Sequence, residues 1–430
     1  MNVYISDLKN HVGEMVTVRG WLYQKRSSGK IKFAVLRDGT GYLQGVLIKG
    51  ECSDDGLDRF EQLTQESSMT MTGSIREDKR APGGYEMTVT DLEIVQIAEE
   101  YPITPKEHGP AFLMDNRHLW LRSSRQHAIM RVRNEITMAI RQFFYERDFI
   151  LIDTPILTGA IGEAANTLFE TQYFDLGKAY LAQTGQLYVE AAAMAHGRVY
   201  CFGPTFRAEK SKTRKHLNEF WMLEPEIAFC DSDCNMQLQE DLVCHIVAWV
   251  LEKSQADLAT LKRDVSKLEA VKAPFPRISY DEAIAALQAA GMSIEYGSDF
   301  GAPDEEKLVE EYDRPVFVYN WPKACKAFYM KQHPERDDLV LCDDLIGPEG
   351  YGELIGGSQR EDDHDRLLAR IREQKLPEDA YKWYLDLRKY GSVPHSGFGL
   401  GLERTVAWIC GLDHVRETIP FARTLGRLYP

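Results

Sequence analysis

The sequence predicts an α+β protein that begins with a small five-stranded β-barrel and continues into a larger part of helices and antiparallel strands. Short alternating apolar runs, separated by turn sequences, fill the first 100 residues. A long amphipathic pattern follows at about residues 124–147. Farther on, two aromatic-rich runs flank a short charged link within residues 202–229, a pattern typical of an antiparallel strand pair. The 430 residues are enough for two or three domains.

Composition narrows the function classes. The net charge of −15 argues against nucleic-acid binding by composition alone, so such binding would need local clusters of cations. No apolar run is long enough to span a bilayer and no leader pattern begins the chain, so we expect a cytoplasmic protein without a membrane partner. Eight cysteines are too few for a disulfide scaffold. A metal site at Cys230, Cys234, Cys244 and His245 is disfavoured, because the last two are adjacent in a predicted helix and point apart.

The first 100 residues form the predicted barrel domain. Five strands in this length fit a barrel of the OB type, which commonly binds nucleic acid. A cluster of cations near the start provides one local site for phosphate: Lys25, Arg26, Lys30, Lys32 and Arg37. The expected strands cover residues 16–22, 31–36, 43–48, 68–75 and 87–95.

Residues 101–117 carry three prolines and little periodicity, which predicts a linker to a second domain at 118–430. The helix expected near 124–147 leads into a strand at 149–155 that ends at a proline. Residues of about 250–315 have a helical, charged pattern to which we assign no chemistry.

The charged link and its flanking strands are the richest stretch for chemistry. Arg207 and Glu209 alternate with small or apolar residues and can share one strand face, as Glu224 and Glu226 can on the returning strand. Unpaired buried charge is costly, so such a face suits a polyphosphate with its magnesium ions, and Phe220 suits a purine. The alternative is a solvated hairpin with surface ion pairs.

Two further dense stretches lie near the end of the chain. The first joins Asp343 and Asp344 to Glu353 and Arg360 through a glycine-rich turn. The second is the run GFGLGLER, residues 397–404, which leads into an apolar helix. Its glycine spacing differs from the G-x-G-x-x-G of dinucleotide-binding folds.

These stretches together resemble the class II aminoacyl-tRNA synthetases of the aspartyl, asparaginyl and lysyl subgroup, and the asparaginyl branch in particular. FGPTFRAE…HLNEFWMLEPE is similar to motif 2, the helix and strand at 124–155 to motif 1, and GFGLGLER to motif 3. The resemblance runs from about Val12 to Pro430. It implies an OB-type anticodon-binding domain, then a class II catalytic domain whose antiparallel sheet is flanked by helices, and a homodimer formed through motif 1.

The resemblance also implies an activity and a set of site residues. The expected reaction activates L-asparagine with ATP and magnesium and transfers it to tRNA(Asn). Arg207, Glu353 and Arg404 are the expected catalytic residues, and Glu209, His216 and Phe220 complete the ATP site. The expected magnesium ligands are Asp344, Glu353 and Glu226, with Asp343 as the adjacent alternative to Asp344. The expected anticodon residues are Arg26, Phe33 and Gln44.

Amino-acid specificity has a physical basis, because a carboxamide offers a donor and an acceptor where a carboxylate only accepts. We expect Glu224 to accept from the substrate amide and Arg360 to donate to it, while Glu163 and Gln186 bind the α-amino group. A glutamate at 224 would also repel aspartate. Aspartyl enzymes place a lysine where this chain has Val189. The chain also departs from the family after Glu163, where alanine replaces the usual glycine.

Three alternatives stay open at this point. One is an aspartyl-tRNA synthetase of relaxed specificity, because the segment 213–219 also resembles archaeal-type aspartyl enzymes. Another is a paralogue that has lost catalysis, although Arg207, Glu353 and Arg404 together argue against it. The last is an amidating enzyme on the same scaffold, although such relatives lack the barrel.

Overall fold

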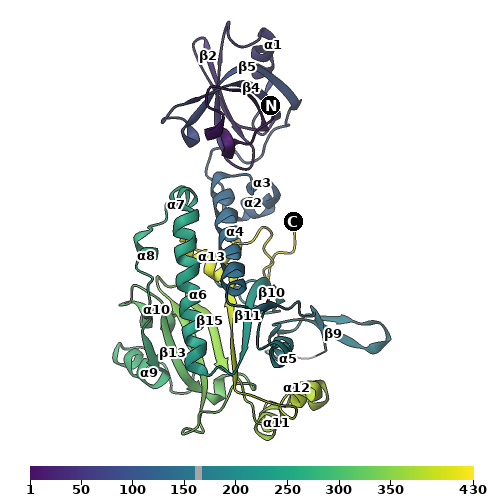
Figure 1. Cartoon of the computed structure of the whole chain (residues 1–430), viewed down its shortest axis with the longest axis vertical. Helices are drawn as coiled ribbons and strands as arrows, with labels where there is room; N and C mark the ends of the chain where they lie inside the picture. The colour runs from purple at the N-terminus through teal and green to yellow at the C-terminus, as the bar shows by residue number, and fades with distance from the viewer. Residues whose placement is uncertain (160–166) are drawn as a thin grey trace. The chain divides into compact units, whose positions relative to one another are not determined.

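The computed structural model describes residues 1–159 and 167–430 and divides the chain into two compact units, Met1–Leu113 and Met114–Pro430 (Figure 1). Each unit has its own hydrophobic core. Within the described ranges, we find no helix with both the length and the apolar character that a membrane span requires.

The first unit is a closed five-stranded barrel, which confirms the predicted OB-type fold. Its strands follow the order β1-β2-β3-β5-β4, and β3 and β5 run parallel while the other neighbours are antiparallel. Alternate residues of each strand point inward and fill the barrel with apolar side chains. The strands are β1 (Met15–Ser28), β2 (Ile31–Arg37), β3 (Tyr42–Ile48), β4 (Ser68–Glu77) and β5 (Tyr85–Gln96).

One helix of the barrel, α1 (Asp54–Gln62), lies between β3 and β4 and was not predicted. Ser53 caps it, because its hydroxyl accepts from the Gly56 N–H at 2.9 Å, and two aspartates in the first turn favour the helix N-terminus. Leu57 and Phe60 belong to the barrel core.

The expected linker at 101–117 is partly helical. Helix α2 (Pro110–Asp115) begins at a proline, which suits the first turn because no hydrogen bond is lost there, and α3 (Arg117–Trp120) follows. Arg117 holds this region in place: its guanidinium donates to the carbonyls of Pro420 (2.8 Å) and Ile419 (3.0 Å) and to Gln126 Oε1 (2.7 Å). Sequence pattern could not show the two carbonyl partners, which lie 302 and 303 residues away along the chain.

The second unit is built on an eight-stranded sheet in the order β12-β13-β14-β15-β16-β11-β10-β6. The six central strands pair antiparallel, as expected, and the two edge strands, β12 and β6, pair parallel to their neighbours. The strands are β6 (Ile150–Leu151), β10 (Arg198–Phe206), β11 (Glu219–Ala228), β12 (Arg277–Ser279), β13 (Val316–Pro322), β14 (Leu339–Gly347), β15 (Gly352–Gln359) and β16 (His395–Gly401).

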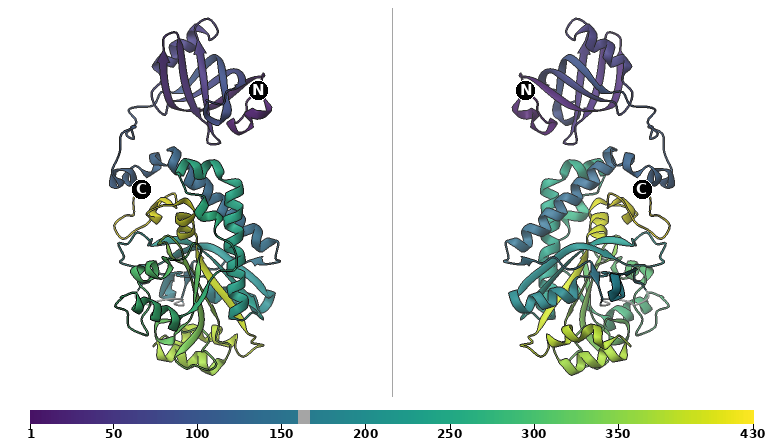
Figure 2. Two further views of the ribbon diagram at one scale, coloured as in Figure 1. Left: turned by 90° about the vertical axis from the view of Figure 1, so that its left-hand side faces the viewer. Right: turned by 90° about the vertical axis from the view of Figure 1, so that its right-hand side faces the viewer.

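Three helices form the core of this unit with the sheet: α4 (Ser124–Tyr145), α6 (Ser232–Lys253) and α13 (Leu402–Cys410). Figure 2 shows the long helices α4 and α6 along one face of the sheet. The apolar face predicted for α4 is fully buried, as its members Ile129, Val132, Ile136, Ile140 and Phe143 all have 0% exposure. Burial of this stripe, more than helix propensity, stabilises such a helix.

Smaller elements surround this core. The stretch expected to be helical at 250–315 contains α7 (Gln255–Leu261), α8 (Ser266–Glu269), α9 (Tyr280–Ala289) and α10 (Ala302–Val309), and it also supplies strand β12. A second sheet joins β7 (Leu157–Thr158), β9 (Lys178–Leu181) and β8 (Glu170–Gln172), and α5 (Gln186–His196) follows it. Helices α11 (His364–Glu373) and α12 (Lys382–Asp386) pack around a separate apolar cluster.

Candidate active site

A cavity of about 380 Å³ opens over strands β11, β14, β15 and β16 and the start of α13. It gathers most of the residues that the sequence singled out, although they come from segments more than 200 residues apart. Its lining includes Gln186, Arg207, Glu209, His216, Phe220, Glu224, Asp344, Glu353, Arg360 and Arg404. Glu163 lies outside the residues that the structure describes.

One side of the cavity is the hairpin of β10 and β11 with the charged link between them. Arg207 lies at the end of β10, and its guanidinium carbon is 5.4 Å from the centre of the Phe220 ring. His216 Nε2 is 3.5 Å from Glu209 Oε2 across the link. Burial lowers the pKa of His216, an effect that Glu209 opposes. A planar aromatic ring beside an arginine offers stacking for a base and charge for a phosphate.

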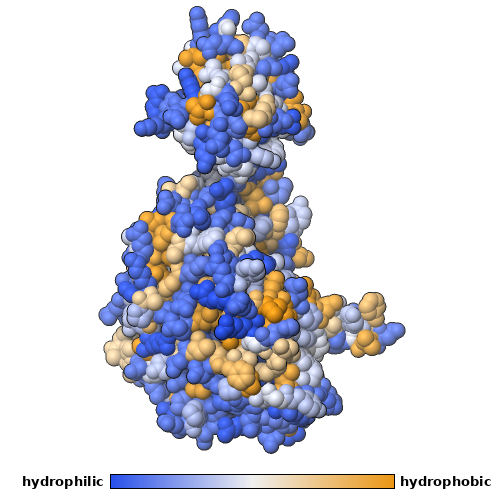
Figure 3. Space-filling model, in the orientation of Figure 1, coloured by the Kyte–Doolittle hydropathy of each residue, from blue (hydrophilic) through white to orange (hydrophobic). Residues whose placement is uncertain are grey.

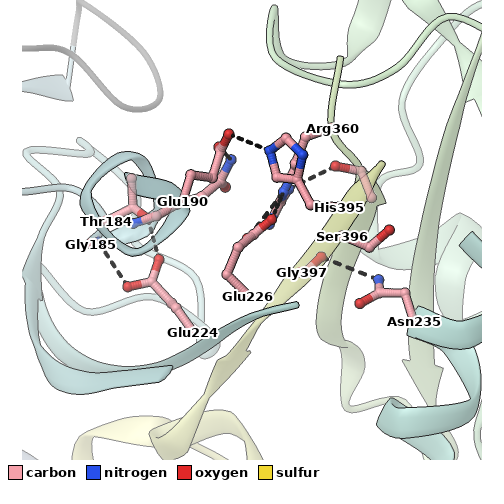
Figure 4. A network of polar contacts seen from close by, with 12 residues as sticks. Thr184, Gly185, Glu190, Glu224, Glu226, Asn235, Arg360, His395, Ser396 and Gly397 are labelled. Atoms are coloured by element: carbon pink, nitrogen blue, oxygen red, sulfur yellow. Dashed lines mark hydrogen bonds and ion pairs between the residues drawn. The ribbon is translucent and has the colours of Figure 1, made fainter. Parts of the chain in front are cut away.

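Glu224 lies at the far end of the cavity, where the backbone turns into α5. Three donors of the protein hold its carboxylate. Figure 4 shows the Gly185 N–H, at 2.8 Å, and the Thr184 hydroxyl, and the third donor is the Cys201 thiol at 3.4 Å. The carboxylate is only 5% exposed, and both of its oxygens are fixed in direction. It can accept one more hydrogen bond from a small polar ligand in the cavity.

Arg360 lines the same cavity and is bound from behind by Glu226. The Arg360 Nε and a terminal nitrogen contact the Glu226 carboxylate at 2.9–3.2 Å, and the other terminal nitrogen donates to Ser358 Oγ at 2.7 Å. Glu226 is 0% exposed and is not among the described residues that line the cavity. Arg360 occupies its carboxylate, so this geometry favours a role for Glu226 in orienting Arg360 over the expected role as a magnesium ligand.

A buried cluster that the sequence analysis missed lies behind Gln186, one of the residues that line the cavity. Glu190, on α5, accepts from His395 Nε2 at 3.0 Å (Figure 4). It also accepts from Tyr384 (2.7 Å), Arg388 (2.8 Å) and Gln186 Nε2 (3.1 Å). Burial alone would raise the pKa of Glu190, but Arg388 and His395 hold it below its usual range. The only sequence signal was the spacing of Gln186 and Glu190 at i and i+4 on one helix.

The two adjacent aspartates of β14 point in opposite directions, as strand alternation requires. Asp343 is fully buried and accepts from Asn235 and Gln239 of α6, and burial raises its pKa to about 6. Asp344 instead faces the cavity. This geometry favours Asp344 over Asp343 as a ligand-binding residue.

The side chains of Asp344, on β14, and Glu353, on β15, approach each other beside Gly356. A Cβ atom at Gly356 would lie 2.8 Å from Glu353 Oε1 and 3.6 Å from Asp344 Oδ1, so the glycine leaves room between the carboxylates. Burial raises the pKa of Asp344 to about 7, and the charge of Glu353 adds to the rise. Lys326, which the sequence analysis missed, donates to Asp344 Oδ2 at 2.6 Å.

Asp344 and Glu353 can supply two protein ligands to a magnesium ion, and the remaining ligands would come from the substrate phosphates. Among the described residues, no group of three His, Cys, Asp or Glu side chains is arranged to hold a metal ion. Magnesium, however, is commonly bound by one or two carboxylates together with substrate phosphates. Two carboxylates that face a cavity lined by three arginines, which can bind phosphate, match that requirement.

The barrel brings together the three residues expected to read an anticodon. The Arg26 guanidinium lies 4.1 Å from the centre of the Phe33 ring and donates to Gln44 Oε1 at 3.4 Å. Most of the other cations of that cluster have internal partners. Lys25 donates to carbonyls at the end of α1, Lys32 pairs with Glu61, and Arg37 pairs with Glu66.

The structure contains a disulfide that the sequence analysis did not expect. Cys230 and Cys234 form a disulfide, whereas Cys244 remains a free thiol.

Comparison with known proteins agrees with this geometry. Residues 109–425 match the family model for class II tRNA synthetases (D, K and N), and residues 16–95 match that for an OB-fold nucleic acid binding domain. The chain is 59% identical over 426 residues to the asparagine–tRNA ligase of Desulforamulus reducens, covering 99% of each chain. It is 57% identical to that of Koribacter versatilis, covering 99% of this chain and 98% of the relative.

Two solved structures with a similar fold are also asparaginyl-tRNA synthetases. The asparaginyl-tRNA synthetase of Pyrococcus horikoshii complexed with asparaginyl-adenylate superposes with a TM-score of 0.96 at 45% identity, covering 100% of both chains. The Entamoeba histolytica asparaginyl-tRNA synthetase superposes with a TM-score of 0.92 at 32% identity, covering 100% of this chain and 99% of that one. The chain belongs to the class II tRNA synthetases of the D, K and N group.

Proposed function

We propose that this protein is an asparagine–tRNA ligase that joins L-asparagine to tRNA(Asn) with ATP. The observation that carries the proposal is that Glu224 and Arg360 line the same cavity. A fixed carboxylate can accept from the amide nitrogen of asparagine, and a guanidinium can donate to its amide oxygen. The same carboxylate repels aspartate, and Val189 is buried in the core where aspartyl enzymes place a lysine.

The reaction has two steps. An α-carboxylate oxygen of asparagine attacks the α-phosphorus of ATP, and the bond to the leaving pyrophosphate breaks to give asparaginyl-adenylate. A ribose hydroxyl at the 3′ end of the tRNA then attacks the carbonyl carbon of the adenylate, and AMP leaves. Both steps depend on alignment and charge neutralisation more than on a protein nucleophile.

The cavity residues have distinct roles in this scheme. Phe220 stacks on the adenine, while Glu209 and His216 bind its edge. Arg207 contacts the α-phosphate, where negative charge grows, and Arg404 contacts the γ-phosphate.

Gln186 accepts from the α-amino group of asparagine, and the Glu190 cluster fixes the Gln186 side chain. Asp344 and Glu353 would hold magnesium, which neutralises phosphate charge when bound.

The barrel would bind the anticodon. Splayed single-stranded bases are read by stacking and by hydrogen bonds to their edges. The exposed part of Phe33 offers the stacking surface, Arg26 the charge, and Gln44 an amide that donates and accepts. The cytoplasm, where tRNA is charged, is the expected location.

A homodimer is also part of the proposal. Strand β6 is an edge strand whose Ile150 and Leu151 are 45% and 38% exposed. Met138 and Tyr145 of α4 are also exposed apolar residues of this unit, at 48% and 81%. Figure 3 shows further apolar colour near the hairpin of β8 and β9. An exposed apolar sheet edge is a common site of subunit contact. Light scattering is expected to give twice the chain mass, and a monomer at micromolar concentration would contradict this part.

Aminoacylation tests the function directly. Purified protein, ATP, magnesium and a tRNA with the asparagine anticodon should yield asparaginyl-tRNA from labelled asparagine. The same tRNA with an altered anticodon serves as the matched control and should be charged poorly. Equal charging with aspartate would favour the aspartyl alternative.

A further inference from the structure

Helix α10 lies in the stretch 250–315, to which the sequence analysis assigned no chemistry. Its first turn is fixed because Asp304 accepts from the Gly301 N–H at 2.9 Å. Its last turn is fixed because Leu308 and Val309 belong to the core cluster around β13 and β14. A side chain in the middle of this helix therefore has a well-defined position. Glu305 is that side chain, and it is 15% exposed.

Glu305 contacts two elements of the candidate active site. Its Oε2 is 3.4 Å from the ammonium nitrogen of Lys215, in the charged link. Its Oε1 is 3.4 Å from the backbone nitrogen of Glu353, on β15. The carbonyl of that same Glu353 accepts from Arg404, so the backbone of Glu353 is held at both its N–H and its carbonyl.

The backbone is adapted to this contact. Gly352 has φ +75°, and a Cβ atom there would lie 2.6 Å from the Lys215 nitrogen and would overlap the Glu305 carboxylate. A residue with a side chain would be strained in this conformation and would also push the ion pair apart. The chain therefore passes close to the pair only because position 352 is a glycine.

Lys215, Glu353 and Arg404 line the cavity, whereas Glu305 is not among the described residues that do so. We propose that Glu305 is a positioning residue for the triphosphate end of the ATP site. It holds the Lys215 ammonium at the cavity edge and fixes the backbone of Glu353. The inference rests on the proposed function and extends it to a residue that does not itself touch the substrate.

The physical reason is the flexibility of lysine. An unrestrained lysine side chain loses much conformational freedom when it binds a phosphate, and a fixed carboxylate partner reduces that loss. Removing the partner should weaken ATP binding and leave asparagine binding unchanged, because Glu224 and Arg360 lie at the other end of the cavity.

The test is a double-mutant cycle measured by ATP–pyrophosphate exchange, with calorimetric ATP binding in the absence of asparagine as a second readout. Glu305→Gln keeps an oxygen for the Glu353 N–H but loses the charge that holds Lys215. We expect it to raise KM for ATP about fivefold, with KM for asparagine unchanged and the same melting temperature. In a Lys215→Ala background, Glu305→Gln should change KM for ATP less than twofold. Glu306→Gln, on the exposed face of the same helix, is the control and should match the unaltered protein.

Three results would overturn the inference: an unchanged KM for ATP in Glu305→Gln, independent effects of the Glu305 and Lys215 substitutions, or an equal rise in KM for both substrates. If the unaltered protein itself shows no exchange, the proposed function fails. If it exchanges normally and the Glu305 variants match it, only this inference fails.

Discussion

The Glu226–Arg360 pair gives the sharpest prediction, because the sequence and the structure assign Glu226 different roles. In Glu226→Gln, the three contacts at 2.9–3.2 Å lose their charge, and both side chains are at most 4% exposed, so water cannot replace the carboxylate. Leaving a buried charge without its partner costs about 3–5 kcal/mol. Because the glutamine still offers an amide oxygen to Arg360, we expect the free energy of unfolding to fall by about 3 kcal/mol.

Guanidinium-induced unfolding of the catalytic unit, followed by fluorescence, measures that loss. Arg360 would also lose its fixed orientation toward the cavity, so KM for asparagine should rise about tenfold while KM for ATP stays constant. The magnesium concentration at half-maximal exchange should not change. A shifted magnesium requirement with unchanged stability would refute the reasoning and restore Glu226 as a metal ligand.

Three further predictions concern other parts of the chain. Phe33→Leu removes a stacking surface worth about 1–3 kcal/mol per base, so KM for tRNA should rise at least about fivefold while ATP–pyrophosphate exchange stays normal; a loss of exchange would contradict the assigned role. Glu224→Gln should lower kcat/KM for asparagine at least about tenfold and narrow the preference over aspartate, and an unchanged preference would count against Glu224. Burial lowers the pKa of His414 to about 4, so the unfolded chain binds the proton more readily and stability should fall as pH drops from about 6.5 toward 4. His414→Asn should reduce that slope by about 1 kcal/mol per pH unit below about pH 6, because the group is partly exposed, and equal slopes in the variant and the unaltered protein would exclude this cause.

Local patterns predicted much of the fold. Alternation located the barrel strands, and the apolar stripe of α4 located the core face of the longest predicted helix. The hairpin of β10 and β11 followed from two apolar runs around a charged link. These features depend on neighbours in the sequence, which a single chain displays directly.

Features that depend on distant partners could not be predicted. Glu224 and Glu226 share one strand face by alternation, yet Glu224 lines the cavity while Glu226 is covered by Arg360, the residue after β15. Lys326 and Glu305 lie beside the cavity only because the sheet brings their segments there. Arg117 orders part of the expected linker through carbonyls near the C-terminus.

Asp343 and Asp344 illustrate the same limit on a small scale. Alternation requires that they face opposite sides of β14, but the sequence does not say which side carries the cavity. The position of α6, whose Asn235 and Gln239 bind Asp343, decides it.

ATP–pyrophosphate exchange with asparagine and with aspartate, at matched concentrations and with magnesium, shows which amino acid the site activates. We expect exchange with asparagine and little with aspartate, because Glu224 accepts from an amide and repels a carboxylate. Equal or faster exchange with aspartate would contradict the assigned roles of Glu224 and Arg360, and no exchange with either amino acid would contradict the proposed activity itself.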